Sequence, residues 1–97
     1  MRIAKSHWAS KNGTLLVYDK IEHFLCGFIL FVILWCKWDT IPALLGVIFV
    51  GFMWEIKDGF MPWEKYGFWG GEGFCWKDLV STVAGALLGV LIDAVLK

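Results

Sequence analysis

The chain has 97 residues, of which 59% are hydrophobic and 19% charged, and its formal net charge is zero. This length supports one domain, and the balanced charge excludes a nucleic-acid-binding protein, which needs a basic face. Seven Trp and eight Phe in so short a chain indicate contact with a membrane interface. We therefore expect one all-α membrane domain over residues 1–97, built as a small bundle of three transmembrane helices.

The first predicted elements are an N-terminal segment and a transmembrane helix over about residues 19–36. Trp8 lies among basic residues, so the N-terminal segment forms either a short interfacial helix or a frayed tail. A spanning helix needs ~20 mainly apolar residues, with a lower limit near ~17, and the first helix meets this limit. Residues 24–35 show no polar face at any helical period, which argues against a soluble three-helix domain.

A second, shorter transmembrane helix is predicted over about residues 42–58, after a tight turn. Pro42 suits the first turn of this helix. The loop that follows, residues 59–77, is rich in Gly and aromatic side chains. Its backbone would be unsatisfied in hydrocarbon, so we expect it to lie along the interface with Trp63 and Trp69 in the headgroup zone.

The third transmembrane helix is predicted over about residues 78–96. Gly85 and Gly89 have a GxxxG spacing, which permits close approach of another helix. This approach is either packing inside the monomer or contact within an oligomer. Because three helices cover one another poorly, we expect a homo-oligomer through these glycines. Asp93 lies ~22 Å along the axis from Asp78 and is expected to pair with the C-terminal lysine.

Three crossings bring the start of the first helix, the end of the second and the start of the third to one side of the membrane. Most of the basic residues fall on that side, namely Arg2, Lys5, Lys11, Lys20, Lys57, Lys65 and Lys77. Lys37 and Lys97 fall on the other side. The positive-inside rule therefore predicts that the N-terminus and this end of the bundle face the cytoplasm.

The same end of the bundle receives a group of ionisable side chains. Asp19 and His23 share a face of the first helix, Glu55 and Asp58 share a face of the second, and Asp78 opens the third. Such groups near hydrocarbon face the bundle interior or water. Carboxylates that meet there need a lysine (Lys20, Lys57 or Lys77), a proton or a divalent cation to neutralise them. We predict a divalent metal site, of unknown metal, made by Asp19, His23, Glu55 and Asp78.

Each of these residues also has a simpler interpretation. Asp19 and Asp78, each taken alone, are better explained as helix N-caps, and His23 as an interfacial histidine bonded to a carbonyl. Glu55 and Asp58 have no such explanation, because the helix dipole disfavours an acid near a helix C-terminus.

Three stretches, taken in order, resemble the VanZ-like family and related small bacterial membrane proteins of the periplasmic-lipoprotein type. They are DKIEHF at 19–24, WEIKD at 54–58 and GFCWKDLVSTVAGALLG at 73–89. The resemblance spans about residues 19–90 and implies a bacterial or phage-encoded inner-membrane protein. By this resemblance, the functional positions of the family correspond in this chain to Asp19, Lys20, His23, Glu55, Asp58 and Asp78.

The chain departs from that family pattern at Cys75, where the pattern has Ser, and at Thr82, where it has Asn. The relatives would also place the polar group outside the cytoplasm, whereas the charge distribution of this chain places it inside.

Two functions follow from this arrangement. The first is metal-assisted or acid–base hydrolysis of a lipid or lipid-linked headgroup, with Glu55, His23 and Asp58 as catalytic residues. Residues expected to contact the substrate are Lys20, Lys77, Trp63, Trp69 and Thr82. Lys20 either meets a substrate phosphate or simply points to water or headgroups. The alternative is a non-enzymatic protein whose polar group orders the bundle and binds a lipid, an antibiotic or a membrane-protein partner.

Overall fold

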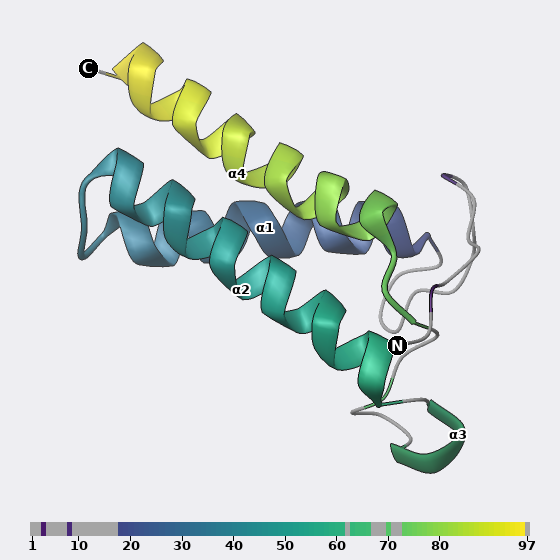
Figure 1. Cartoon of the computed structure of the whole chain (residues 1–97). Coiled ribbons are helices and arrows are strands. Elements are labelled where there is room, and N and C mark those ends of the chain that lie inside the picture. The colour runs from purple at the N-terminus through teal and green to yellow at the C-terminus, as the bar shows by residue number, and fades with distance from the viewer. Residues whose placement is uncertain are drawn as a thin grey trace.

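The computed structural model describes Ile3, Trp8, Gly70 and residues 18–61, 63–66 and 73–96. The regular elements of this part of the chain are the helices α1 (Asp19–Trp35), α2 (Thr40–Phe60), α3 (Trp63–Tyr66) and α4 (Trp76–Leu96). The prediction of an all-α chain is confirmed. Figure 1 shows that the start of α1, the end of α2 and the start of α4 lie at the same end of the molecule.

The helix boundaries differ from the predicted ones by a few residues. Helix α2 begins at Thr40 and therefore holds Pro42 in its first turn, where a missing backbone N–H costs nothing. Helix α4 begins at Trp76, so Asp78 is in its first turn rather than ahead of it. Tyr18 is the N-cap residue of α1 and no side chain caps that helix, so Asp19 does not act as an N-cap.

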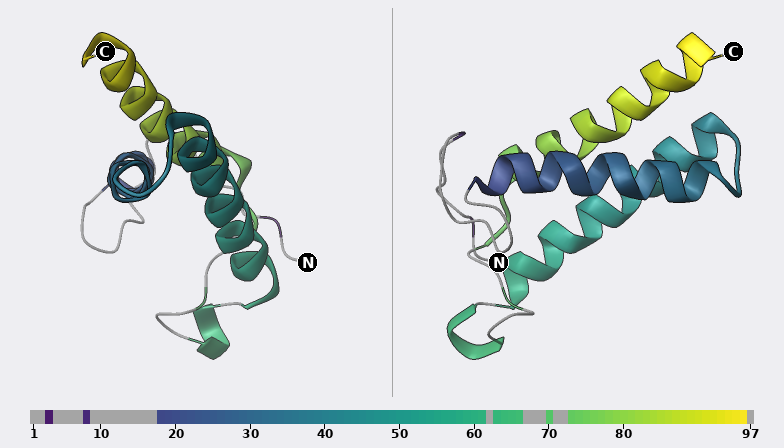
Figure 2. Two further views of the ribbon diagram at one scale, coloured as in Figure 1. Left: turned by 90° about the vertical axis from the view of Figure 1, so that its left-hand side faces the viewer. Right: turned by 180° about the vertical axis from the view of Figure 1, so that it is seen from behind.

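Helices α1 and α4 form the closest pair in the bundle, and Figure 2 shows that they cross at an oblique angle and diverge toward the C-terminus of α4. A Cβ atom added at Gly27 of α1 would stand 1.9 Å from the carbonyl oxygen of Thr82. One added at Gly85 of α4 would stand 1.9 Å from the carbonyl oxygen of Phe24. The two backbones are therefore in direct contact, which only residues without a side chain permit.

Gly89 continues this contact, because a Cβ atom there would stand 2.3 Å from the ring of Phe31. The GxxxG pair Gly85 and Gly89 thus packs against α1 of the same chain, which is the first of the two roles that the sequence left open. The homo-oligomer stays a prediction.

A small apolar core lies beyond the polar end of the bundle. It consists of Phe31, Ala43, Val47 and Ala86, all fully buried. Phe31 also stacks on Trp35, with ring centroids 6.1 Å apart. This core joins α1, α2 and α4 near the turn between α1 and α2.

A polar contact lies at the far end of the bundle, away from the acidic residues. Thr40 Oγ1 at the start of α2 donates a hydrogen bond to Asp93 Oδ2 of α4. Asp93 is buried, with 4% of its surface exposed. The predicted partner of Asp93, Lys97, lies outside the described residues. The contact with Thr40 instead links α4 to the N-terminus of α2, where a negative charge is favourable.

Most large apolar side chains point outward, among them Ile33, Phe49 and Leu91 with 55%, 66% and 59% of their surface exposed. The buried set includes polar and charged residues, namely Asp19, Lys20, Glu55, Ser81, Thr82 and Asp93. Exposure of so many large apolar side chains is typical of contact with lipid or another protein.

Helices α2 and α4 are each long and apolar enough to cross a membrane. Helix α1, with 17 residues, is at the lower limit for a spanning helix. The predicted membrane domain is therefore supported by two helices of the described chain.

Candidate metal centre

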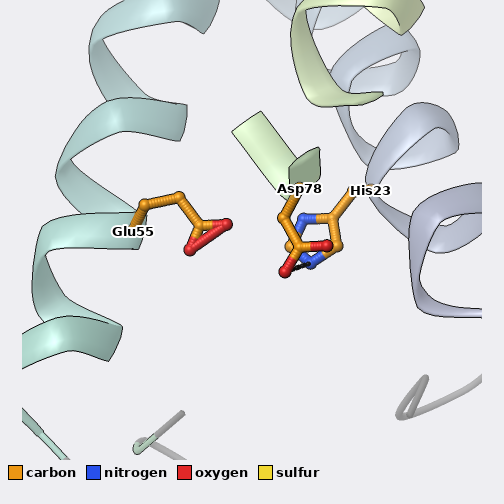
Figure 3. A group of neighbouring side chains, drawn as sticks. All are labelled: His23, Glu55 and Asp78. Carbon is orange, nitrogen blue, oxygen red and sulfur yellow. Dashed lines mark ion pairs between the residues drawn. The ribbon is translucent and has the colours of Figure 1, made fainter. Parts of the chain in front are cut away.

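Three side chains from three helices converge at the polar end of the bundle. They are His23 of α1, Glu55 of α2 and Asp78 of α4, and Figure 3 shows them directed toward one another. One ligand atom of each residue lies within 4.8 Å of the other two. The structure thus brings together three of the four residues predicted as metal ligands.

Glu55 is the most unusual of the three. Its side chain lies near the C-terminal end of α2 with only 1% of the residue exposed. Neither carboxylate oxygen makes a hydrogen bond within the described part of the chain. Burying an unpaired carboxylate costs several kcal/mol, so a proton or a cation has to accompany it.

His23 and Asp78 are spaced as two ligands of one ion would be. His23 Nε2 lies 3.6 Å from Asp78 Oδ2, which is too long for a hydrogen bond. Two ligand atoms that each lie ~2.1 Å from a common ion are at most ~4.2 Å apart. The separation of His23 Nε2 and Asp78 Oδ2 is therefore compatible with shared coordination of one ion.

Thr82 determines how the His23 imidazole presents its nitrogens. The Thr82 hydroxyl donates to the carbonyl oxygen of Asp78 at 3.0 Å and lies 3.5 Å from His23 Nδ1. The Thr82 hydroxyl hydrogen is donated to the Asp78 carbonyl oxygen. The Thr82 oxygen can then only accept from His23, which favours the imidazole tautomer with its hydrogen on Nδ1. The unprotonated Nε2 then faces Asp78. Thr82 is buried beside the imidazole, and its predicted contact with a substrate stays a prediction.

Lys20 joins the acidic group from the first turn of α1. Its Nζ lies 2.9 Å from Asp19 Oδ2 and 2.8 Å from Asp78 Oδ1, and the residue is only 6% exposed. The prediction that Lys20 points to water or headgroups is wrong. Lys20 is seven residues before Gly27, so both lie on the face of α1 that packs on α4.

Asp19 is therefore engaged by Lys20 and is not part of the three-residue group that His23, Glu55 and Asp78 form. Asp78 links Lys20 to the three-residue group, because one of its oxygens faces Lys20 and the other faces His23.

Asp58, predicted as a catalytic residue, lies one turn beyond Glu55, and its side chain interacts with that of Glu55. Its Oδ1 is 2.8 Å from Lys57 Nζ. The same ammonium lies 3.7 Å from the centre of the Trp54 ring, a cation–π contact. Lys57 therefore opposes the charge of Asp58.

The remaining predicted substrate contacts are only partly described. Lys77 Nζ lies 5.8 Å from the Trp8 ring and 5.9 Å from the Trp76 ring. The two rings meet edge to face at 5.6 Å, so the N-terminal segment contacts the start of α4 at Trp8. The side chain of Trp63 and the whole of Trp69 lie outside the described residues.

Comparisons of the chain with protein-family models, with curated proteins and with solved structures found no match. Membership of the VanZ-like family therefore stays a prediction, and the chemistry of the site has to be argued from its own residues.

Two features of the site were missed by sequence reasoning. The first is the contact of Thr82 with His23, which no local spacing indicates because the two residues lie on different helices. The second is the role of Gly27, which turns one face of α1 onto α4. The sequence gives one indication of this role of Gly27. Lys20, Gly27 and Phe31 recur at helical spacing and so share one face of α1, and the structure shows that all three are buried.

Proposed function

We propose that the chain is an integral membrane protein in which α1, α2 and α4 all cross the bilayer. The lengths and apolar composition of α2 and α4 support this, as does the apolar exterior of the bundle. The excess of Lys and Arg at the polar end favours a cytoplasmic location for that end. The resemblance of three stretches to the VanZ-like family supports a bacterial or phage-encoded inner-membrane protein.

We further propose that His23, Glu55 and Asp78 hold a divalent cation and use it to hydrolyse a lipid or lipid-linked headgroup. The observation that carries this proposal is the buried, unpaired carboxylate of Glu55, directed at an imidazole and a second carboxylate. Imidazole and carboxylate are ligands that Zn²⁺ and Mn²⁺ accept. A site with three protein ligands leaves a position for water or a substrate oxygen.

The bound ion would supply a Lewis acid that activates water and polarises the substrate. In the hydrolysis, the water oxygen forms the new bond to the phosphoryl or acyl centre. The ester bond to the leaving group breaks, and the leaving oxygen takes up a proton. Glu55 and His23 lie close enough to the site to hold the ion and to accept or return that proton.

The proposal is tested by the turnover of lipid-phosphate and lipid-ester substrates with the purified chain. Glu55→Gln and His23→Ala should each lower kcat/KM by about 100-fold or more, because each removes a ligand or a proton carrier. Glu64→Gln is a matched control, since it replaces an exposed carboxylate of α3. Activity that is unchanged in both site variants would end the hydrolase proposal.

A second candidate function is favoured by the position of Lys20. Its contacts with Asp19 and Asp78 tie α1 to α4, as expected of a polar lock in a protein that binds a lipid, an antibiotic or a membrane-protein partner. Such a lock predicts that Lys20→Met, which removes both contacts, loses stability. A catalytic group predicts that Glu55→Gln is as stable as the wild type or more stable. Thermal unfolding in detergent micelles separates the two.

A further inference from the structure

The acidic group contains a built-in positive charge that no step of the proposed hydrolysis uses. Lys20 Nζ lies 2.8 Å from Asp78 Oδ1, while Asp78 Oδ2 faces His23 Nε2. The Asp78 carboxylate therefore lies between the Lys20 ammonium and the proposed cation site. Because Lys20 is only 6% exposed, little water lies around it to screen its charge.

The charges of the residues in direct contact at the site do not balance one another. Asp19, Glu55 and Asp78 supply carboxylates, and Lys20 supplies one ammonium. The nearby charge of Asp58 is opposed by Lys57. His23 acts as a neutral ligand, so two negative charges remain. A divalent cation balances them, whereas a trivalent cation would leave an excess positive charge in a site of low polarity.

We propose that Lys20 determines the charge of the cation that this site selects and thereby makes it a divalent site. This inference rests on the proposed cation site at His23, Glu55 and Asp78. Lys20 is a specificity-determining residue that acts through Asp78 and does not coordinate the ion. Its removal adds one uncompensated negative charge, which strengthens the binding of a trivalent ion more than that of a divalent ion.

The test compares Tb³⁺ and Mn²⁺ binding to the purified full chain in detergent micelles. Tb³⁺ luminescence excited through tryptophan reports binding, since Trp54 directly precedes Glu55, and Mn²⁺ displaces the probe in competition. We expect Lys20→Met to shift the affinity ratio toward Tb³⁺ by about tenfold or more. Lys20→Arg keeps the charge and should retain the wild-type ratio. Lys37→Met, in the exposed turn at the opposite end, should also leave it unchanged.

Asp19→Asn provides an independent variant in case Lys20→Met does not fold, which circular dichroism reports. It removes one negative charge and should shift the ratio toward Mn²⁺. If Lys20→Met folds and keeps the wild-type Tb³⁺-to-Mn²⁺ affinity ratio, the role of Lys20 is overturned and the cation site still stands. If Lys20→Met does not fold, a wild-type ratio in Asp19→Asn has the same meaning. Absence of Tb³⁺ and Mn²⁺ binding in the wild type overturns the cation site and this inference together.

Discussion

Gly85 of α4 lies so close to Phe24 of α1 that a Cβ atom added at Gly85 would stand 1.9 Å from the Phe24 carbonyl oxygen. This contact fixes the register of the two helices. Asp78 lies two turns before Gly85 on the same face of α4, and His23 directly precedes Phe24. The spacing of the candidate ligands therefore depends on the packing of glycine against backbone.

Gly85→Ala should destabilise the bundle. The added methyl group meets backbone atoms, which cannot move aside without separating α1 from α4, and overpacking of this kind costs about 1–3 kcal/mol. Gly51→Ala is the control, because its nearest neighbours are side-chain atoms of Thr82 and Leu79 at 3.2 and 3.3 Å. Thermal unfolding in detergent measures both variants, and equal stability of the two would contradict the proposed backbone contact.

Thr82→Val should weaken the binding of a divalent cation by about tenfold, because loss of a group that orients a metal-bound histidine has effects of this size. Valine keeps the shape of threonine but removes the oxygen that faces His23 Nδ1. Thr82→Ser restores the oxygen and should restore affinity. Calorimetric titration with Mn²⁺ measures all three proteins. Wild-type affinity in Thr82→Val would show that the hydroxyl does not orient His23.

Thr40→Val should lower stability by about 1–3 kcal/mol without changing cation affinity. It leaves the buried Asp93 carboxylate without the hydrogen bond from Thr40 Oγ1, and this contact lies at the opposite end of the bundle from Glu55. Chemical or thermal unfolding tests the first expectation and Mn²⁺ titration the second. A change in affinity as large as that of Thr82→Val would mean that the two ends are coupled.

The orientation in the membrane can be tested with the native cysteines. Cys36 is exposed in the turn after α1, and Cys75 lies buried at the polar end. With the polar end in the cytoplasm, an impermeant maleimide added to intact cells should label a variant that retains only Cys36 and spare one that retains only Cys75. Labelling of Cys36 only after lysis would favour the inverted orientation that the VanZ-like relatives imply.

The long helices could be predicted from the sequence because their apolar runs are near membrane length and end at polar or turn-forming residues. Helix α3 could not, because the four residues Trp63–Tyr66 lie in a loop rich in Gly and aromatics and show no period. The start of α2 was predicted two residues late, since Pro42 is compatible with several positions in a first turn.

The convergence of His23, Glu55 and Asp78 could be predicted from topology alone, because successive helices return to the same end of the bundle. Lys20 was one of three lysines expected to neutralise these carboxylates, but its position between Asp19 and Asp78 could not be predicted. It depends on the rotation of α1 about its axis, which the contact of Gly27 with Thr82 determines. The contact of Asp93 with Thr40 could not be predicted either, because Thr40 comes near Asp93 only once α2 and α4 are packed.

The central claim, that His23, Glu55 and Asp78 form one cation site, is tested most directly by Mn²⁺ binding to the purified full chain, measured by electron paramagnetic resonance. The account predicts about one tightly bound ion per chain. Glu55→Gln should lose this ion, and the exposed-carboxylate control Glu64→Gln should keep it. A wild-type chain that binds no ion, or a Glu55→Gln chain that binds it with unchanged affinity, would contradict the claim.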